Sequence, residues 1–407
     1  MSVRESFLWL SRKNSVGAGT AADLLRIFGS AEAVYAADRE RFATCGCPLT
    51  KRQVDALCDK DLDEAARILE ACAHKGISVL TIADTAYPDR LRAIADPPLV
   101  LYVRGSWPDF DAIPAIAVVG TRKSTGYGER IAESLGRALA EAGFVVVSGM
   151  AAGNDAAAHR GALRAGGLTV ACFAGGVDVC YPPENQRLMG DILLSGAIVS
   201  EQPPGERHLP GHFHGRNRIL SGLCVAAVVV EAAGSRSGTM ITAHAALDQG
   251  RDVYAVPGAV GAPQSAGCNE LIANGEAEIL TGPETLIRAY GGLMRNKPDE
   301  RLARQAFERQ TGERRKPAEL SAWDEIQKRE QAGRMRKAEP PHSSPAPLPD
   351  TLSPEERQIA ELVAAGASTP AEVVDKSELS AARVMAILTM LEMDGVLIRE
   401  KGALRLR

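Results

Sequence analysis

Six short segments rich in glycine, serine, threonine and asparagine each follow an apolar run of this sequence. They are GTRKSTGYG (120–128), GMAAGNDAAAHRG (149–161), GGVDVCYPPENQR (175–187), PPGERHLPGHFHGRNR (203–218), AGSRSGTMIT (233–242) and PGAVGAPQSAGCNE (257–270). Backbone N–H groups at helix N-termini, together with hydroxyls and arginine guanidinium groups, form sites for phosphate oxygens. We therefore predict that these loops form a phosphate-binding surface.

The first of these loops matches neither of the common nucleotide-binding patterns. Five residues separate Gly120 from Gly126 and no lysine follows, so the segment is not G-x-x-x-x-G-K-[ST]. Gly126-x-Gly128 lacks the third glycine of G-x-G-x-x-G, and no acidic pair at a strand end is placed to hold Mg²⁺. The pattern therefore favours neither an ATPase nor a dinucleotide-dependent enzyme, and it calls for no cofactor.

The run GRNRILSG (215–222) places two arginines around one asparagine at a predicted helix start. Arg216 and Arg218 would offer two guanidinium groups on one rim, with the amide of Asn217 between them. If the loops share one sheet edge, Arg122 and Arg187 converge on the same place. The alternative is an ordinary helix N-terminus with solvated arginines.

Metal binding and acid–base catalysis find little support in the residue pattern. His208, His212 and His214 stand in a Pro/Gly-rich loop without a carboxylate at regular spacing, so we predict no metal site there. Asp155 and His159 are four residues apart at a predicted helix start. In that position Asp155 is expected to cap the helix and His159 to pack against its neighbours.

The elements that must position these loops are strands buried on both faces. Short apolar runs (AIAVVG, FVVVSG, TVACFA, GAIVSE, CVAAVVVEA and DVYAVPG) alternate with helical segments up to about residue 282. They lack the in–out alternation of a half-exposed sheet, which is typical of parallel strands covered by helices. The fold class is therefore predicted as α/β, an extended Rossmann-like, doubly wound parallel sheet. Ligands of such sheets bind beyond the carboxyl ends of the strands.

Four regions differ in composition. Residues 1–75 show helical periodicity, and SVGAGTAADLLRIFG (15–29) is similar to a helix-hairpin-helix turn, whose N–H groups can hold a phosphate, or to plain helix packing. Residues 76–293 carry the sheet. Residues 294–350 are charged and rich in Pro and Ser, as in a linker. Residues 351–407 show three helices and two strands, as in a winged helix. Its recognition helix bears few charges, so protein contact or weak duplex contact is at least as well supported as sequence reading.

Composition limits the function classes further. The formal charge of −4 and pI near 6.1 give no overall attraction to nucleic acid, so a polyanion site must be a local basic patch. The eight cysteines contain no C-x-x-C, and several lie in apolar runs, as buried thiols in a reducing compartment do. No apolar run has the length of a membrane span, and MSVRESFLWLSRKN is not a signal peptide. These features predict a cytoplasmic location without membrane contact.

Seven motifs in order resemble the DNA-processing protein A family, over about residues 80–290. They are VVGTRKSTGYG, SGMAAGNDAAAHRGAL, AGGVDVCYPPENQRL, SEQPPG, FHGRNRILSGL, VVVEAAGSRSGTMITAHAALDQGRDVYAVPG and SAGCNELIANGEAEIL. Proteins of this family bind single-stranded DNA in bacterial natural transformation and pass it to the recombinase RecA. The N-terminal helices resemble the family's sterile-alpha-motif-like domain, and the C-terminal region resembles its winged helix.

The resemblance implies a protein that binds and protects single-stranded DNA, loads RecA and is not an enzyme. It implies a homodimer through the sheet edge at 265–279, with Leu271, Ile272 and Ile279. Two departures from the family pattern stand out: His214-Gly215 follows Phe213 in place of a proline, and Pro183 stands where a lysine is common. The implied DNA-binding residues are Gly120, Arg122, Ser124, Gly149, Gly153, Asp155, Arg187, Phe213, Arg216, Asn217, Arg218, Ser237, Gly238 and Thr239.

The main alternative is an enzyme on the same kind of sheet. Nucleotide phosphoribohydrolases of the lysine-decarboxylase-like group need P-G-G-x-G-T-x-x-E, whose glutamate serves the glycosidic chemistry. The corresponding segment here is AGSRSGTMITAH, with Thr242 near the glutamate position and no Pro-Gly-Gly. A purely scaffolding protein, the third alternative, would leave the basic loops unexplained.

Overall fold

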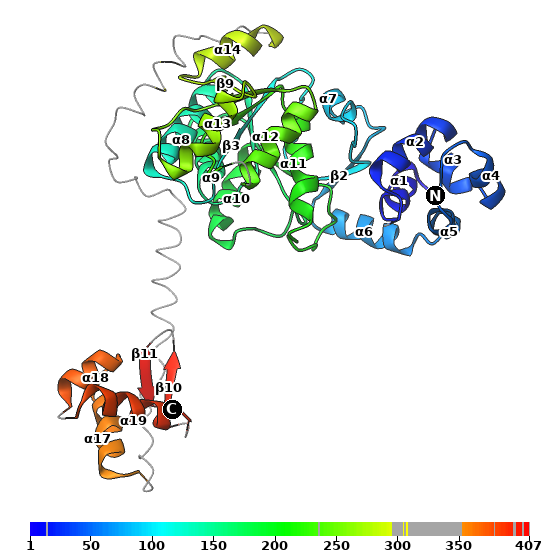
Figure 1. Cartoon of the computed structure of the whole chain (residues 1–407). Helices are drawn as coiled ribbons and strands as arrows, with labels where there is room; N and C mark the ends of the chain where they lie inside the picture. The colour runs from blue at the N-terminus through cyan, green and yellow to red at the C-terminus, as the bar shows by residue number, and fades with distance from the viewer. Residues whose placement is uncertain are drawn as a thin grey trace. The chain divides into compact units, whose positions relative to one another are not determined.

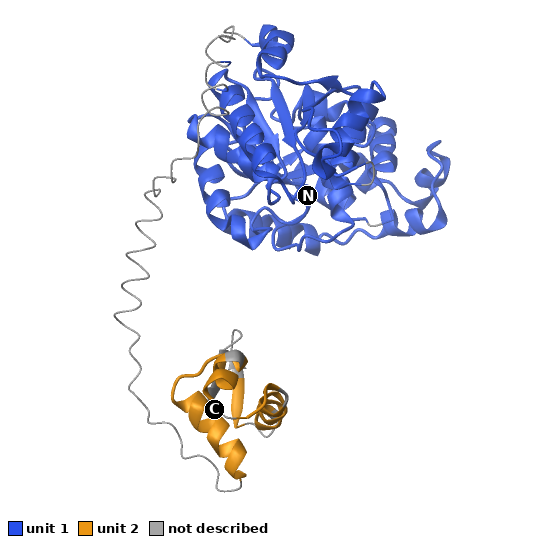
Figure 2. Cartoon of the chain, turned by 60° about the vertical axis from the view of Figure 1, so that its left-hand side comes forward, with its two compact units in different colours: residues 1–314 blue, residues 315–407 orange. Residues whose placement is uncertain are grey.

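The computed structural model describes residues 1–13, 15–234, 237–294, 304, 307, 352–377, 379–393, 396–400 and 403–406. Of the predicted linker (residues 294–350), this set includes residues 294, 304 and 307. The chain divides into two compact units, residues 1–314 and 315–407 (Figure 2). The predicted helical region (residues 1–75) and the predicted sheet region (residues 76–293) thus belong to one compact unit.

One nine-stranded sheet organises the first unit (Figure 1). Its order is β1-β2-β6-β5-β4-β3-β7-β8-β9, and every pair from β6 to β9 is parallel. The predicted α/β fold with a parallel sheet is confirmed, while β1 and β2 add an antiparallel edge. The strands are β1 Ser78–Thr81, β2 Val100–Gly105, β3 Ala115–Val119, β4 Val145–Ser148, β5 Thr169–Cys172, β6 Ala197–Ser200, β7 Ala226–Val229, β8 Asp252–Ala255 and β9 Glu278–Ile279.

Alternate residues of the central strands enter two different cores. Ala115, Ala117 and Val119 of β3 face one core, whereas Ile116 and Val118 face the other. The first core is covered by α7 (Asp89–Arg92), α11 (His212–Gly222), α12 (Gly238–Asp248) and α13 (Ala266–Ala273). The second is covered by α8 (Gly126–Glu141), α9 (Asn154–Arg164) and α14 (Glu284–Tyr290). Burial on both faces explains why these strands read as continuous apolar runs.

Strand β3 lies at the point where the chain reverses its direction across the sheet. The strands β4, β5 and β6 follow on one side of β3, and β7, β8 and β9 follow on the other. At such a switch point the loops after neighbouring strands diverge and leave a crevice at the carboxyl edge. The loops after β3 and β7 therefore border the position where a ligand would be expected.

Six helices precede the sheet, and they pack against its β1–β2 end (Figure 1). Phe7, Leu24 and Phe42 of these helices share one core with Tyr102 of β2 and Met150 after β4. Helices α2 and α3 are separated by two adjacent capping residues. Gly29, at φ 84°, caps the C-terminus of α2, and Ser30 caps the N-terminus of α3. The helices are α1 Val3–Ser11, α2 Ala18–Phe28, α3 Ala31–Ala36, α4 Arg39–Thr44, α5 Lys51–Cys58 and α6 Asp63–His74; α10 (Gln186–Ser195) covers the same core.

The second unit has the predicted three helices followed by two antiparallel strands. They are α17 Pro354–Ala364, α18 Pro370–Lys376, α19 Ala381–Met393, β10 Leu397–Glu400 and β11 Ala403–Leu406. Ile359, Leu388 and Leu404 belong to its core. Arg383 of α19 donates to Glu355 at 2.9 and 2.7 Å, so the one arginine of this helix already has a carboxylate partner. Among the described residues, no helix is long and apolar enough to span a membrane.

Candidate nucleic-acid interface

A cavity of about 420 Å³ lies at the carboxyl ends of the strands around the switch point. The loops after β3, β4, β6 and β7 all contribute to its wall. Of the predicted DNA-binding residues, the cavity is lined by Gly120, Arg122, Asp155, Phe213, Arg216, Asn217, Ser237, Gly238 and Thr239. The sheet topology therefore brings together residues that are up to about 120 positions apart in the sequence.

Arg216 is the buried cation of this cavity, with 9% of its surface exposed. Its Nη1 donates to the carbonyls of Gly149 at 3.0 Å and Cys172 at 2.6 Å, and its Nε donates to Oδ1 of Asn217 at 3.0 Å. A Cβ at Gly149 would overlap the guanidinium group, so a larger residue there would displace Arg216 from this position. Burial lowers the pKa of Arg216, and the nearby Asp155 opposes that shift.

Asp155 holds two strand ends together, a role that differs from the predicted helix cap. The cap of α9 is Gly153, and the Asp155 carboxylate instead accepts from the N–H groups of Gly120 at 3.3 Å and Gly149 at 3.1 Å. Burial raises the pKa of Asp155, while Arg216 and these N–H donors counteract the shift. A carboxylate so occupied positions the loops after β3 and β4.

Glu231, which the sequence analysis did not single out, holds the first of the predicted phosphate-binding loops (120–128) in place. It follows β7, is 1% exposed, and accepts from N and Oγ1 of Thr125 at 3.0 and 2.5 Å. Nδ2 of Asn154 donates to the same carboxylate at 3.3 Å, and a Cβ at Gly128 would collide with it. The sequence feature that could have pointed to Glu231 is its position: it is the acidic residue near the end of the apolar run CVAAVVVEA, directly beside the switch point.

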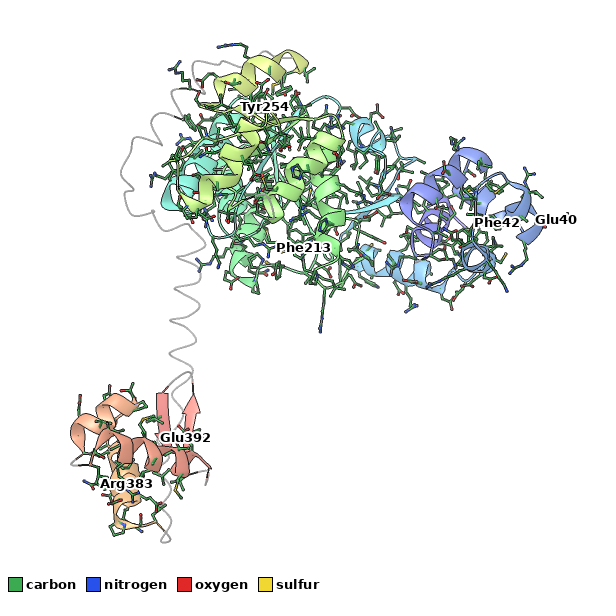
Figure 3. All side chains as sticks on the ribbon, viewed as in Figure 1. Glu40, Phe42, Phe213, Tyr254, Arg383 and Glu392 are labelled. Atoms are coloured by element: carbon green, nitrogen blue, oxygen red, sulfur yellow. The ribbon has the colours of Figure 1, made fainter. Side chains whose placement is uncertain are left out.

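Two arginines surround one aromatic ring at the mouth of the cavity. The guanidinium carbon of Arg122 lies 5.0 Å from the ring centroid of Phe213, and that of Arg216 lies 5.7 Å from it. Arg122 and Lys123 are exposed, and Phe213, labelled in Figure 3, is half-buried. The cavity thus combines positive charge with an apolar ring.

The predicted convergence of four arginines is wrong in two cases. Helix α11 begins at His212, so Arg216 and Arg218 lie beyond its first turn and point in different directions. Nη1 and Nη2 of Arg218 donate to Glu201 at 2.9 and 2.8 Å, and its Nε donates to Asp96 at 3.0 Å. Arg187 lies exposed on α10 and does not line the cavity.

The remaining predicted residues, Ser124, Gly149 and Gly153, are not among those that line the cavity. Ser124 donates to Glu129 at 2.9 Å, and Gly153 lies directly beneath the backbone of Thr121. The three histidines considered for metal binding have separate surroundings: His208 donates to the carbonyl of Val179, His212 donates to that of Ala174, and His214 lines the first cavity. Within the residues that the structure describes, no three His, Cys, Asp or Glu side chains form a metal-ligand group.

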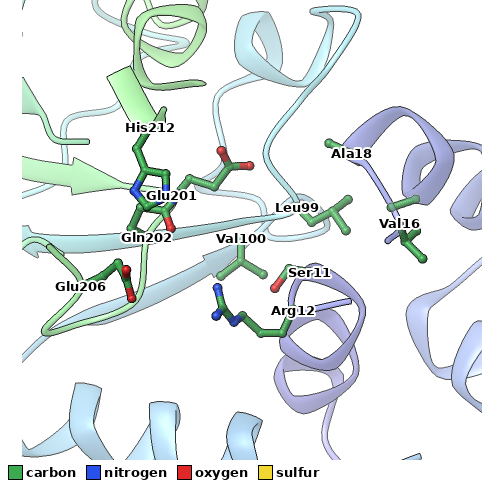
Figure 4. A pocket seen from close by; sticks show the side chains of 11 residues that line it. Ser11, Arg12, Val16, Ala18, Leu99, Val100, Glu201, Gln202, Glu206 and His212 are labelled. Atoms are coloured by element: carbon green, nitrogen blue, oxygen red, sulfur yellow. The ribbon is translucent and has the colours of Figure 1, made fainter. Parts of the chain in front are cut away.

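A second cavity, of about 330 Å³, lies between the first helices and the loop after β6 (Figure 4). Val16 and Ala18, from the turn that is similar to a helix-hairpin-helix, line one side of it. Glu201 and Glu206 line the other side. Arg12 also lines the cavity, but its Nε donates to Glu64 at 2.8 Å. With this cation already paired, the carboxylates of the cavity would repel a phosphate, so it does not suit the phosphate contact considered for the turn.

Comparisons with known proteins agree with this architecture. The family model described as "DNA recombination-mediator protein A" matches residues 78–291, and that of the DprA winged helix domain matches residues 343–403. The chain is 34% identical to the putative DNA processing protein DprA of Mycobacterium tuberculosis over 404 residues, 96% of this chain and 91% of that protein. It is 39% identical over 230 residues to protein Smf of Synechocystis, 56% of this chain and 57% of that protein.

A solved structure supports the same assignment. The X-ray structure of DNA processing protein A from Streptococcus pneumoniae matches with a TM-score of 0.61 and 32% identity, over 71% of this chain and 98% of that one. The fold, both family models and a relative that spans nearly the whole chain thus agree. The chain therefore belongs to the DNA-processing protein A family.

Proposed function

We propose that this protein binds single-stranded DNA without catalysing a reaction on it. The observation that carries the proposal is the pairing of Arg122 and Arg216 around the ring of Phe213 at the switch point. Guanidinium groups and loop N–H groups hold phosphates of any sequence, and an aromatic ring stacks on any base. A flexible single strand can follow several loops, whereas a duplex keeps its bases stacked on one another.

The proposed role in the cell is that of a protein that protects incoming single strands during transformation and loads RecA onto them. This role rests on membership of the family. We further propose a cytoplasmic location and a homodimer through α13 and β9. Leu271 of α13 is buried in the core, whereas Ile279 of β9 is 53% exposed on the edge strand of the sheet and is available for a contact.

A titration with labelled oligonucleotides tests the binding proposal. With roughly three to five phosphate contacts, log affinity should fall against log salt with a slope of about −2 to −3.5. We expect tight binding of a single strand and much weaker binding of the corresponding duplex. Equal affinity for both, or an affinity that does not change with salt, would contradict the proposal.

A second assay tests the enzyme alternative. Incubation with AMP should leave no free adenine, since the carboxylate that lines the cavity, Asp155, is occupied by backbone N–H groups. Release of adenine by the parent protein and not by Asp155→Asn would instead support a phosphoribohydrolase.

A further inference from the structure

A series of aromatic rings leads from the buried core to the surface beside the cavity. Phe173, just after β5, contacts the ring of His208 edge-on, with centroids 5.3 Å apart. Tyr181 stacks on His208 with centroids 5.1 Å apart and an angle of 23° between the planes. Tyr181 also meets Phe213 at 6.0 Å, with an angle of 64°. Phe173 and Tyr181 belong to the connection after β5, His208 lies in the loop after β6, and Phe213 lies in the first turn of α11.

Contacts beneath the outer ring hold it in place. Nε2 of His208 donates to the carbonyl of Val179 at 2.8 Å, and Oδ1 of Asp178 accepts from the N–H of Gly205 at 2.8 Å. Asp178 also forms an ion pair with Lys75 at 2.5 Å. Burial lowers the pKa of His208 and so favours its uncharged imidazole, a suitable surface for stacking.

The outer face of Tyr181 is available to a ligand. Tyr181 is 38% exposed, even though the rings of His208 and Phe213 contact it. His208 covers one of its faces, and Phe213 meets it at an angle. Arg207, which precedes His208 in the chain, is also exposed.

We propose that Tyr181, supported by His208, is a second base-stacking position for the strand that binds at Phe213. The inference rests on the proposed function and deepens it. Phe213 receives one base, and Tyr181 receives a base of a neighbouring nucleotide. The planes of the two rings are inclined by 64°, so bases stacked on both cannot remain parallel to each other. Such an arrangement accepts an unstacked single strand and excludes a duplex.

The competing explanation is that Tyr181 only packs against the loop after β6. Three substitutions separate the two roles: Tyr181→Phe keeps the aromatic face, Tyr181→Leu keeps apolar bulk without it, and Tyr181→Ala removes both. Each variant is titrated with oligo(dT) and with an abasic deoxyribose-phosphate chain of the same length. The two ligands carry the same number of phosphates, and only oligo(dT) carries bases.

If Tyr181 stacks, Tyr181→Ala and Tyr181→Leu should weaken oligo(dT) binding about 5- to 160-fold, the range for loss of one base–aromatic stack. Affinity for the abasic chain and the salt slope should stay at the parent values, and Tyr181→Phe should behave as the parent. Equal losses on both ligands, or unchanged binding of oligo(dT), would overturn the inference. Failure of the parent protein to bind either ligand would instead refute the proposed function.

Discussion

At the scale of single residues, neighbours in one motif have different roles. Arg216 and Arg218 are two positions apart on α11, and side chains at that spacing do not share a helix face. Arg216 reaches the carbonyls of Gly149 and Cys172 beneath the cavity, whereas Arg218 binds Glu201 and Asp96 on another side. Only Arg216 therefore joins Arg122 around Phe213.

Substitution of Arg122 tests the assignment of Arg122, and not Arg218, to the cavity. Arg122→Ala should weaken single-strand binding by about 1–3 kcal/mol and reduce the salt slope by about 0.7, because one charge-assisted phosphate contact is lost. The fold should survive, since Arg122 is exposed in a loop. Filter binding at several salt concentrations measures both quantities.

Arg218→Ala is the matched control for that experiment. It removes the neighbouring arginine of α11, whose guanidinium is held outside the cavity by Glu201 and Asp96. We expect a lower melting temperature with an affinity close to that of the parent. If Arg218→Ala weakens binding and Arg122→Ala does not, the cavity has been assigned to the wrong side of α11.

His159 makes stability depend on pH. Burial lowers the pKa of its imidazole to about 3 in the folded chain, against about 6.5 when unfolded. The unfolded state therefore binds the extra proton first, so stability is complete above pH 6.5 and is lost as the pH falls towards 3. The free energy of unfolding should be about 2 kcal/mol lower at pH 5 than at pH 8 from this group.

Chemical denaturation from pH 8 to pH 4 measures this dependence. The variant His159→Gln removes the titration and keeps an amide that can reach Thr169, the partner of Nδ1 at 2.7 Å. Its stability should vary less with pH over this interval, whatever its absolute value. The same pH dependence in parent and variant would show that other groups are responsible.

At the scale of elements, the loop 120–125 owes its shape to a neighbouring strand. Glu231 after β7 binds Thr125, and its backbone carbonyl accepts from the N–H of Thr121 at 2.9 Å. The loop is thus bound to β7 at two points before any ligand arrives. A phosphate site formed in advance binds more tightly because less entropy is lost on ordering it.

Glu231→Gln should therefore weaken DNA binding without removing a direct contact. The amide has one acceptor oxygen where the carboxylate has two, so a buried donor among Thr125 and Asn154 loses its partner. The expected cost is about 1–3 kcal/mol in unfolding free energy, with weaker binding of the single strand. Denaturation and binding titrations of one preparation measure both. Unchanged stability would show that Glu231 does not organise the loop.

At the scale of the whole molecule, the edge of the sheet at β9 is the place to test assembly. Ile272 packs partly against the core, so a charge there would also test folding, whereas Ile279 is exposed. Ile279→Asp should leave the fold and short-oligonucleotide binding intact. If the edge is the dimer interface, the charge would be desolvated in the contact and the protein would become monomeric.

Light scattering decides the oligomeric state, and RecA loading on long strands reports the consequence. Leu194→Asp is the control, since Leu194 is an exposed apolar residue of α10 away from the β9 edge. A variant at Ile279 that remains dimeric, or a monomer that loads RecA like the parent, would exclude this edge as the functional interface.

The sequence by itself determined the class of sheet, the strand-to-helix loops at its carboxyl edge and the winged helix. Burial on both faces leaves continuous apolar runs, and glycines and hydroxyls mark the strand-to-helix loops, so local pattern is sufficient for these features. Only the tertiary structure decided which polar side chains meet. Whether Arg218 faces a ligand or Glu201, and whether Glu231 or Tyr181 lies beside the cavity, depends on distances between segments far apart in the chain. Local periodicity carries no information on such distances, because strand order and helix rotation set them.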